Sequence, residues 1–278
     1  MILKSFSKIN LSLKVNRKLK SSQLHEIQSY FCLVNLCDDI KIKKIKDRKD
    51  KVSFKGQFSK KIKKNANSII DVLNILRERN LISSHYSVSI NKRIPVFGGM
   101  GGGTSNAICL VKYLTKNIIS KNLINILSKK IGSDSRLFLH KQGFLKNLQK
   151  VEKFQRKHSL CFLIVYPKIK CSTQYIYSKV RVFTSKSDFS FKKINSKNKF
   201  IKLLISENNN LQSIVENKYP NIKKLIKEIR LIEGCYFSRM TGSGSVCYGI
   251  FKSEKSAKAA LNTIKLKYPK YSSWVAKT

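Results

Sequence analysis

Five of the chain's 12 glycines lie in one stretch, Pro95-Val96-Phe97-Gly98-Gly99-Met100-Gly101-Gly102-Gly103-Thr104-Ser105-Asn106-Ala107. Apolar residues recur at helical spacing from Ala107 to Leu114, which predicts a helix that begins at about Thr104 or Ser105. Upstream, apolar and polar side chains alternate in residues 86–91, a pattern typical of a half-buried strand. The predicted order is therefore a strand, a glycine loop (residues 95–106) and the N-terminus of a helix.

This order of elements has the chemistry of a phosphate-binding site. Glycines let the backbone approach a ligand closely and adopt positive φ, and the first amides of a helix are unpaired donors. The helix dipole and the hydroxyls of Thr104 and Ser105 favour an anion at the same place. A flexible linker or a tight turn is the alternative. A linker would have polar, low-complexity borders, whereas this stretch has ordered-looking neighbours, so the pattern favours phosphate binding.

The glycine loop does not match two common nucleotide motifs. A P-loop needs a lysine directly before the Ser or Thr, and Gly103 stands at that place. A dinucleotide-binding fingerprint needs an acidic residue about 20 residues further on. The sequence has no Asp or Glu between Glu78 and Asp134. These absences argue against a P-loop ATPase and against a dehydrogenase.

The net charge of +42 comes from 57 basic and 15 acidic residues in a chain of 278. A nucleic-acid binder would carry such a charge, and so would a protein whose composition has drifted toward lysine. The lysines are scattered through nearly every segment, without an Arg-rich tail or an RNP-type motif, which argues against nucleic-acid binding. A basic surface would in either case attract anionic small substrates.

Cysteine usage and the N-terminus predict a cytoplasmic protein. The cysteines are seven in number, have no CxxC spacing, and predict reduced side chains without a disulfide framework or a metal site. The first residues lack the apolar region of a signal peptide, and no apolar run reaches membrane-spanning length, so we expect no membrane association.

The first strand of the chain carries polar side chains on one face. Apolar and polar residues alternate in residues 8–13, and Lys8 and Asn10 share the polar face. Such a face is either plain solvent surface or the floor of a site for a phosphorylated ligand. A polar connection at residues 16–23 then leads to His25, the one histidine of the four that follows a strand and loop able to line a pocket.

Local signals mark several further elements. Asp38-Asp39 predicts a turn, Asn67 predicts the N-cap of a helix, and Ser120 predicts the cap of another. The Lys- and Ser-rich residues 184–198 predict a poorly ordered loop. A second glycine turn, residues 239–245, precedes a predicted strand.

The overall pattern predicts an α+β fold with two domains. The chain is globular in composition, with 42% hydrophobic residues. Strands and helices are mixed without a regular βαβ alternation. An apolar run at residues 160–167 predicts a buried strand, and we place a boundary ahead of it. The predicted domains are residues 1–152 and 153–278.

A catalytic base for phosphoryl transfer can be sought by elimination among the few acids. Most lie in charged loops or on Lys-rich helices, where solvated pairs are usual, although Glu26 and Glu152 remain candidates. Asp134 follows a glycine helix stop at Gly132 and precedes an apolar segment, so it is our preferred base. A helix cap or an Asx-turn is an equally good interpretation of Asp134. Lys8 beside it would lower its pKa and stabilise charge on the transferring group.

Four blocks resemble, in this order, the motifs of the GHMP kinases: Lys8-Ile9-Asn10-Leu11, residues 95–106, Gly132-Ser133-Asp134, and Met240-Thr241-Gly242-Ser243-Gly244. The resemblance is greatest to the branch that phosphorylates 4-diphosphocytidyl-2-C-methyl-D-erythritol in non-mevalonate isoprenoid precursor synthesis. Three further features carry it: the segment His25-Glu26-Ile27-Gln28-Ser29, Asn67 at a helix start, and Lys92-Arg93-Ile94-Pro95. It covers essentially the full length of the chain.

The resemblance implies ATP and Mg²⁺ as cofactors, an anionic cytidine-diphosphate substrate, and an active site in the cleft between two α+β domains. It implies catalysis by Asp134 as base and Lys8 as its electrostatic partner. The implied ATP-binding residues are Pro95, Gly98, Gly99, Gly101, Gly102, Gly103, Thr104, Ser105, Asn67 and Lys92. The implied substrate-binding residues are Asn10, His25, Thr173, Tyr177, Gly242, Ser243 and Gly244. No metal ligand is implied, and we expect a monomer or a weak homodimer.

The sequence departs from the family pattern in four places. Leu24 stands where the family has an aromatic that stacks on cytosine, and residues 16–23 lack the usual glycine. Ser135-Arg136 replaces Val-Pro after the aspartate, and residues 146–150 replace a glycine-rich turn. These changes leave the kinase motifs intact and predict an altered contact with cytidine.

Three other functions stay open. The chain would also fit a GHMP kinase that acts on homoserine, mevalonate or a sugar. A basic RNA-binding protein on a kinase-like scaffold would explain the charge, and its affinity would fall steeply with salt. A kinase fold without catalysis is disfavoured because Lys8, Asp134 and the glycine loop occur together.

Overall fold

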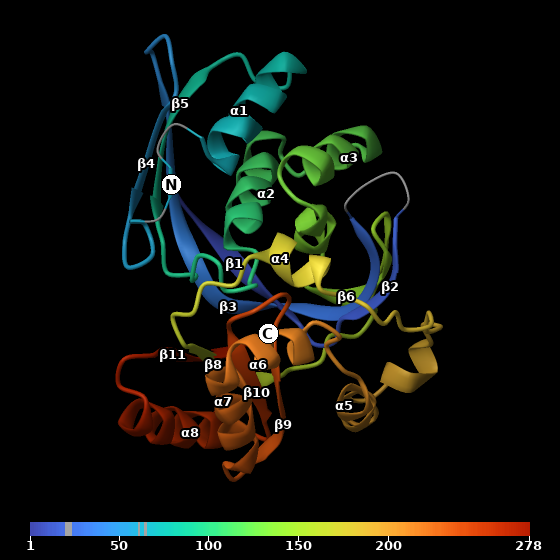
Figure 1. Ribbon diagram of the computed structural model, residues 1–278. Helices are drawn as coiled ribbons and strands as arrows, with labels where there is room; N and C mark the ends of the chain where they lie inside the picture. The colour runs from blue at the N-terminus through green and yellow to red at the C-terminus, as the bar shows by residue number, and fades with distance from the viewer. Residues whose placement is uncertain (20–23, 61, 64–65) are drawn as a thin grey trace. The chain divides into compact units, whose positions relative to one another are not determined.

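A computed structural model describes residues 1–19, 24–60, 62–63 and 66–278 (Figure 1). Residues 20–23 of the predicted polar connection therefore lie outside the described residues. The chain forms two compact units, each described by itself. The first unit comprises Met1–Lys8, Leu36–Val96 and Gly101–His140, and the second comprises Ile9–Asn35, Phe97–Met100 and Lys141–Thr278. Each unit is thus built from three separate segments of the chain. The predicted domain boundary after residue 152 stays a prediction.

The first unit packs helices on strands. Its strands are β1 (Ile2–Asn10), the second half of β3 (His25–Ile45), β4 (Lys51–Lys55) and β5 (His85–Asn91). β3 pairs antiparallel with β5 from Asp39 to Ile45, and β4 pairs parallel with β5. Figure 1 shows the helices of this unit on one side of these strands. They are α1 (Ser68–Glu78), α2 (Gly102–Leu114), α3 (Lys121–Lys130) and the 3₁₀ helix η1 (Ser133–Leu139).

Capping residues begin these helices largely as predicted. Asn67 accepts hydrogen bonds from the amides of Ile69 and Ile70, and Ser120 caps α3, which confirms both predicted caps. α2 begins at Gly102, two residues before the predicted start. Gly101 precedes it with a φ of +66°, a conformation that glycine adopts without steric cost, so the glycines extend the helix N-terminus into the loop.

The second unit contains the first half of β3 with β2 (Lys14–Lys18), β6 (Gln142–Asn147) and β7 (Lys150–Lys153). A separate antiparallel sheet has the order β11-β8-β10-β9. Its strands are β8 (Cys161–Tyr166), β9 (Cys235–Met240), β10 (Cys247–Phe251) and β11 (Ser272–Lys277). The prediction of a buried strand in residues 160–167 is confirmed, because β8 is almost wholly buried.

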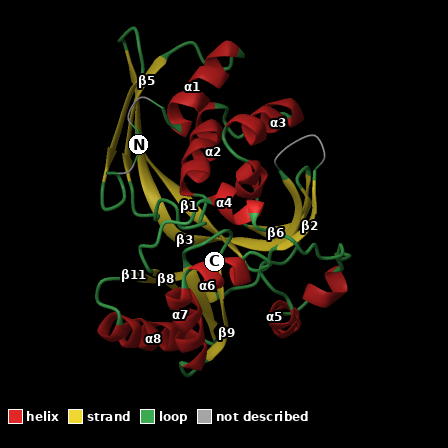
Figure 2. Cartoon of the chain, in the orientation of Figure 1, coloured by secondary structure: helices red, strands yellow, loops and turns green. Residues whose placement is uncertain are grey.

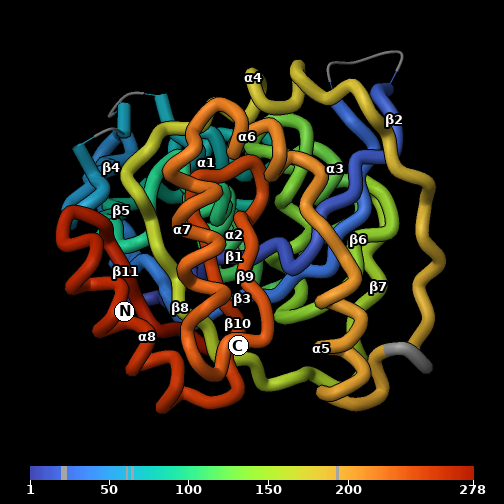
Figure 3. Tube along the Cα trace, turned by 60° about the horizontal axis from the view of Figure 1, so that its bottom comes forward, coloured from blue at the N-terminus to red at the C-terminus, as the bar shows by residue number. Residues whose placement is uncertain are grey.

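Helices cover the four-stranded sheet of the second unit. α7 (Pro220–Leu231) contacts β9 and β10, and α8 (Glu254–Lys267) contacts β8 and β11 (Figure 3). The other helices of this unit are α4 (Thr173–Ser178), η2 (Phe191–Ile194), α5 (Lys197–Ser206) and α6 (Gln212–Lys218). Figure 2 shows strands and helices mixed in both units, and the predicted α+β class is confirmed. None of the helices in the described residues is long and apolar enough to cross a membrane.

One local prediction is wrong. Asp38-Asp39 forms no turn, because both residues lie inside β3, which continues unbroken to Ile45.

The loop predicted in residues 184–198 is present at residues 184–190, and η2 and the start of α5 follow it. Poor order in this segment stays a prediction. Phe189 stacks on Phe144 with ring centroids 5.3 Å apart, a contact that the sequence pattern did not predict.

The reason for the error at Asp38 is a buried ion pair. The Asp38 carboxylate is fully buried and pairs with the Lys92 ammonium, which is 2% exposed. It also accepts the backbone N–H groups of Arg93 and Ile94 at 2.7 and 2.8 Å. Burial lowers the pKa of Lys92, and the Asp38 carboxylate opposes that shift. Asp38 thereby fixes the backbone directly ahead of the glycine loop.

We predict that Asp38→Ala lowers the free energy of unfolding by about 3–5 kcal/mol, because it leaves the Lys92 ammonium buried without its partner. The control is Asp47→Ala, which removes an exposed ion pair with Lys51 and should cost less than about 1 kcal/mol. Urea denaturation followed by circular dichroism measures both. Equal losses in the two variants would contradict the role given to Asp38.

Candidate active site

Three glycines of the glycine loop lie at the N-terminus of α2 in the first unit. Other atoms pack closely around Gly101 and Gly102, but not around Gly103. A Cβ at Gly101 would lie 2.8 Å from the Phe138 ring, and one at Gly102 would lie 2.9 Å from Ile94 Cγ2. At Gly103 the nearest atom is the Ser68 hydroxyl at 3.7 Å, so this face is open. Neighbouring side chains therefore require the first two glycines. The third leaves the backbone accessible, as a bound phosphate would need.

The two hydroxyls at the start of α2 have different surroundings. Ser105 is buried, lies 2.7 Å from the Ser5 hydroxyl and donates to the Phe6 carbonyl, which ties α2 to β1. The Thr104 hydroxyl would lie 3.2 Å from a Cβ at Gly132, two residues before Asp134. The Thr104 hydroxyl thus lies close to the segment that carries the predicted base, whereas Ser105 already has protein partners.

Lys8 and Asp134 form an ion pair within the first unit. Lys8 Nζ lies 2.9 Å from Asp134 Oδ2. The Lys8 side chain is 4% exposed, whereas that of Asp134 is 28% exposed. The exposed part of Asp134 leaves its carboxylate reachable by a ligand. A Cβ at Gly101 would lie 3.3 Å from Lys8 Cγ, so the pair lies beside the glycine loop.

Asn67 and Lys92 also lie near the start of α2, although neither presents a free side chain. Asn67 uses its amide oxygen to cap α1, and the adjacent Ser68 donates to the Gly103 carbonyl at 3.1 Å. Lys92 Nζ lies 3.4 Å from the Cβ position of Gly102. Its ammonium therefore lies beside the helix N-terminus, where it is already paired with the Asp38 carboxylate. Contact of either residue with adenine stays a prediction.

In the second unit, the other end of the glycine loop packs against the glycine turn. The Val246 amide donates to the Gly98 carbonyl at 3.2 Å. A Cβ at Gly99 would lie 2.4 Å from the Thr241 carbonyl oxygen. The backbone N–H of Asn10 donates to the Thr241 hydroxyl at 2.9 Å, and a Cβ at Gly242 would lie 3.3 Å from Asn10 Oδ1. The structure thus brings Asn10, Gly98, Gly99 and Gly242 together in one unit.

Thr173 connects the glycine turn to α4. Its hydroxyl lies 2.8 Å from that of Ser243. The Cβ of a residue at Gly244, which has a φ of +85°, would lie 2.6 Å from Met240 Sδ. Close packing and positive φ both require glycine there. The same helix α4 carries Tyr177, so two predicted substrate residues project from one element.

His25 lies in an aromatic cluster of the second unit. Its ring centroid is 5.2 Å from that of Tyr177 and 6.2 Å from that of Phe183. His25 is 8% exposed, and its Nδ1 has no hydrogen-bond partner among the residues that the structure describes. Burial, followed by the nearby Lys18 charge, lowers the pKa of His25, so the ring is neutral at pH 7. A buried, unpaired ring nitrogen is a ready contact for a ligand.

The sequence analysis missed Phe183. It is 44% exposed and its ring stacks on His25 at an interplanar angle of 28°. Leu24, where an aromatic was expected, is 51% exposed. Phe183 lies more than 150 residues from His25 in sequence, and no local pattern marks the contact.

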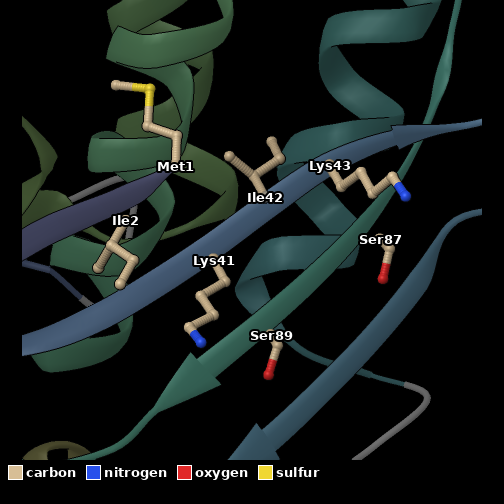
Figure 4. Close-up of a pocket in the computed structure, with 7 residues that line it drawn as sticks. All are labelled: Met1, Ile2, Lys41, Ile42, Lys43, Ser87 and Ser89. Atoms are coloured by element: carbon tan, nitrogen blue, oxygen red, sulfur yellow. The ribbon is translucent and has the colours of Figure 1, made fainter.

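A pocket of about 340 Å³ lies elsewhere on the first unit (Figure 4). It is lined by Met1, Ile2, Lys41, Ile42, Lys43, Ser87 and Ser89. None of the predicted site residues lines it. Across the described ranges, no group of three or more His, Cys, Asp or Glu side chains could hold a metal ion.

Comparison with known proteins identifies the family. Residues 196–270 match the family described as GHMP kinases C terminal. The chain is 35% identical over 271 residues to the 4-diphosphocytidyl-2-C-methyl-D-erythritol kinase of Pelagibacter ubique, covering 96% of this chain and 94% of that kinase. It is 32% identical over 288 residues to the kinase of the same name from a Wolbachia of Drosophila simulans, covering 99% and 97%. The chain belongs to the 4-diphosphocytidyl-2-C-methyl-D-erythritol kinase family.

Solved structures have the same fold. A crystal structure of 4-(cytidine 5'-diphospho)-2C-methyl-D-erythritol kinase matches with a TM-score of 0.76 at 20% identity, covering 100% of this chain and 98% of that one. Homoserine kinase from Cytophaga hutchinsonii matches with a TM-score of 0.66 at 13% identity, covering 99% and 94%. The fold is thus shared between kinases of this family and kinases with other names.

Two departures from the kinase family pattern leave the Lys8–Asp134 pair undisturbed. Ser135 is fully buried and its hydroxyl donates to the Gly132 carbonyl at 2.7 Å. Arg136 donates to Asn125 on α3.

In residues 146–150, the Asn147 side chain accepts the backbone amides of residues 149 and 150, both at 2.9 Å. This Asx-type turn closes the β6–β7 hairpin without glycine.

We predict that Gly103→Ala leaves the fold intact and weakens ATP binding about tenfold, because a methyl group would occupy the open side of the glycine loop. Its free energy of unfolding should stay equal or rise by up to about 1 kcal/mol, since alanine favours helix. Urea denaturation and calorimetric titration with ATP measure the two effects.

The matched variant is Gly99→Ala, which should lower the free energy of unfolding by about 1–3 kcal/mol. Its φ of +75° and the Thr241 carbonyl at 2.4 Å leave no room for Cβ. Unchanged ATP affinity in Gly103→Ala would show that phosphate does not approach at this glycine.

Proposed function

We propose that this kinase transfers the γ-phosphoryl group of ATP to a hydroxyl of 4-diphosphocytidyl-2-C-methyl-D-erythritol, a step of non-mevalonate isoprenoid precursor synthesis. The observation that carries the proposal is the Lys8–Asp134 ion pair at 2.9 Å beside an open glycine at the start of α2. The names of the relatives in Pelagibacter and Wolbachia support the acceptor.

Asp134 acts as the base in this proposal. Its carboxylate is paired through Oδ2 with a buried ammonium, and it is exposed enough to accept the proton of the acceptor hydroxyl. Lys8 also supplies positive charge where negative charge develops during transfer. Phosphoryl transfer depends chiefly on positioning and electrostatics, so a fixed ion pair beside the phosphates is a suitable arrangement.

The start of α2 holds the phosphates of ATP. The unpaired amides of its first turn and the Thr104 hydroxyl favour an anion there. Bound ATP supplies the phosphoryl group and Mg²⁺ neutralises its charge. We expect Mg²⁺ to enter with ATP.

The second unit binds the acceptor. Neutral His25 offers its unpaired Nδ1 to the edge of the cytosine ring, and Tyr177 and Phe183 supply aromatic surface. Phe183 would thereby take the place of the aromatic residue that the family has at the position of Leu24. We assign the remainder of the acceptor to Asn10, Thr173 and the glycine turn, whose hydroxyls and glycines lie within one unit.

The test of this function is ADP release from ATP and Mg²⁺ with three acceptors: 4-diphosphocytidyl-2-C-methyl-D-erythritol, homoserine and mevalonate. We expect turnover with the cytidine-diphosphate acceptor alone. Turnover confined to homoserine or mevalonate would keep the kinase and refute the acceptor. Turnover with none of them would refute the function.

We predict that Asp134→Asn lowers kcat about 10³-fold while the Kd for ATP stays within about threefold, because the amide cannot accept the proton but preserves the shape. Asp71→Asn is the control, since Asp71 is an exposed acid on α1 of the same unit. Steady-state kinetics and calorimetry measure both. A wild-type kcat in Asp134→Asn would rule out Asp134 as the base.

A further inference from the structure

Phe97 occupies a backbone conformation that favours glycine. Its φ is +61°, in the left-handed region, although it carries an aromatic side chain. That side chain is 43% exposed, so burial in a core does not explain it. We interpret this strained, exposed aromatic side chain in the glycine loop as a binding residue.

The Phe97 ring contacts the ammonium of Lys170. Lys170 Nζ lies 4.6 Å from the ring centroid, within the range of a cation–π interaction. Lys170 is exposed and takes part in none of the ion pairs found among the described residues. The ring therefore restricts where the ammonium lies without neutralising its charge, and an anion is the ligand that such a cation favours.

The backbone on both sides of this contact is fixed to the glycine turn of the second unit. Next to Phe97, the Gly98 carbonyl accepts the Val246 amide. On the other side, Ile169 lies one residue before Lys170, and its carbonyl accepts a hydrogen bond from the Ser245 hydroxyl. The Thr173 hydroxyl, three residues after Lys170, lies 2.8 Å from that of Ser243. Lys170 and Phe97 are thus anchored to one turn by their neighbours.

The cytidine-binding residues of the proposed function lie on the helix that follows. α4 begins at Thr173 and carries Tyr177, whose ring contacts His25. At a rise of about 1.5 Å per residue, Tyr177 lies about 6 Å along the axis from Thr173. The segment that carries Lys170 therefore leads directly into the helix that contacts the His25 cluster.

We propose that Phe97 and Lys170 form a subsite for the diphosphate group of a cytidine-diphosphate ligand. This inference rests on the proposed function, because the diphosphate is the part of that acceptor next to cytidine. Lys170 donates to the phosphate oxygens, and Phe97 holds its ammonium in place, which lowers the cost of ordering a long side chain. The assignment goes to the acceptor because Thr173, three residues after Lys170, contacts Ser243 and begins the helix whose Tyr177 contacts His25.

The direct test compares binding of cytidine 5'-diphosphate and cytidine by calorimetric titration. Lys170→Ala should weaken binding of the diphosphate about tenfold and leave the affinity for cytidine unchanged, because only the diphosphate meets the missing charge. Phe97→Gly should weaken it about threefold, and Phe97→Tyr should restore the wild-type value. The control is Lys168→Ala, which removes an equal charge from an exposed lysine of the same segment.

Steady-state kinetics provide the second arm. Lys170→Ala should raise KM for 4-diphosphocytidyl-2-C-methyl-D-erythritol and leave KM for ATP unchanged. A rise confined to ATP would overturn the assignment to the acceptor. Equal loss of affinity in Lys168→Ala and Lys170→Ala would overturn the subsite, because general surface charge would explain both.

Failure of this inference and failure of the proposed function are distinguishable. Tight binding of cytidine 5'-diphosphate by Lys170→Ala, together with full turnover in the wild type, overturns the subsite alone. Absence of turnover in a wild type whose diphosphate binding depends on Lys170 supports the subsite and overturns the function. Absence of both turnover and diphosphate binding in the wild type overturns both.

Discussion

The buried pair of Asp38 and Lys92 sets the position of the glycine loop in the first unit. The Asp38 carboxylate pairs with the Lys92 ammonium directly after the end of β5. It also accepts hydrogen bonds from the backbone N–H groups of Arg93 and Ile94. Because the charges are desolvated, neither partner can be lost without leaving the other unpaired. The backbone that enters the glycine loop is therefore fixed from strand β3, and the paired Lys92 ammonium is held beside Gly102.

The Lys8–Asp134 pair depends on the same surroundings. Lys8 comes from β1 and packs beside Gly101, while Phe138 of η1 closes over that glycine from the other side. A side chain at Gly101 would displace both. The ion pair and the helix N-terminus therefore occupy one region of the first unit, which supports a role for both in the same phosphoryl transfer.

Short-range chemistry made part of this architecture predictable. The caps at Asn67 and Ser120 depend on residues two or three positions away, and the loop before α2 depends on its own glycines, so the sequence pattern sufficed. The burial of Asp38 depends on Lys92, 54 residues further on, and its charge suggested an exposed turn. The stacking of Phe183 on His25 likewise joins distant segments and had no local signal. Motif order indicated Lys8 and Asp134 as partners, and their distance in the structure is consistent with that expectation.

The central claim is phosphoryl transfer to the acceptor, and ³¹P NMR of a reaction containing the protein, ATP, Mg²⁺ and 4-diphosphocytidyl-2-C-methyl-D-erythritol tests it most directly. The account predicts a new phosphomonoester resonance that grows at the rate at which ADP appears, while the diphosphate of the acceptor stays intact. Formation of ADP with inorganic phosphate alone, or loss of the acceptor diphosphate, would contradict it.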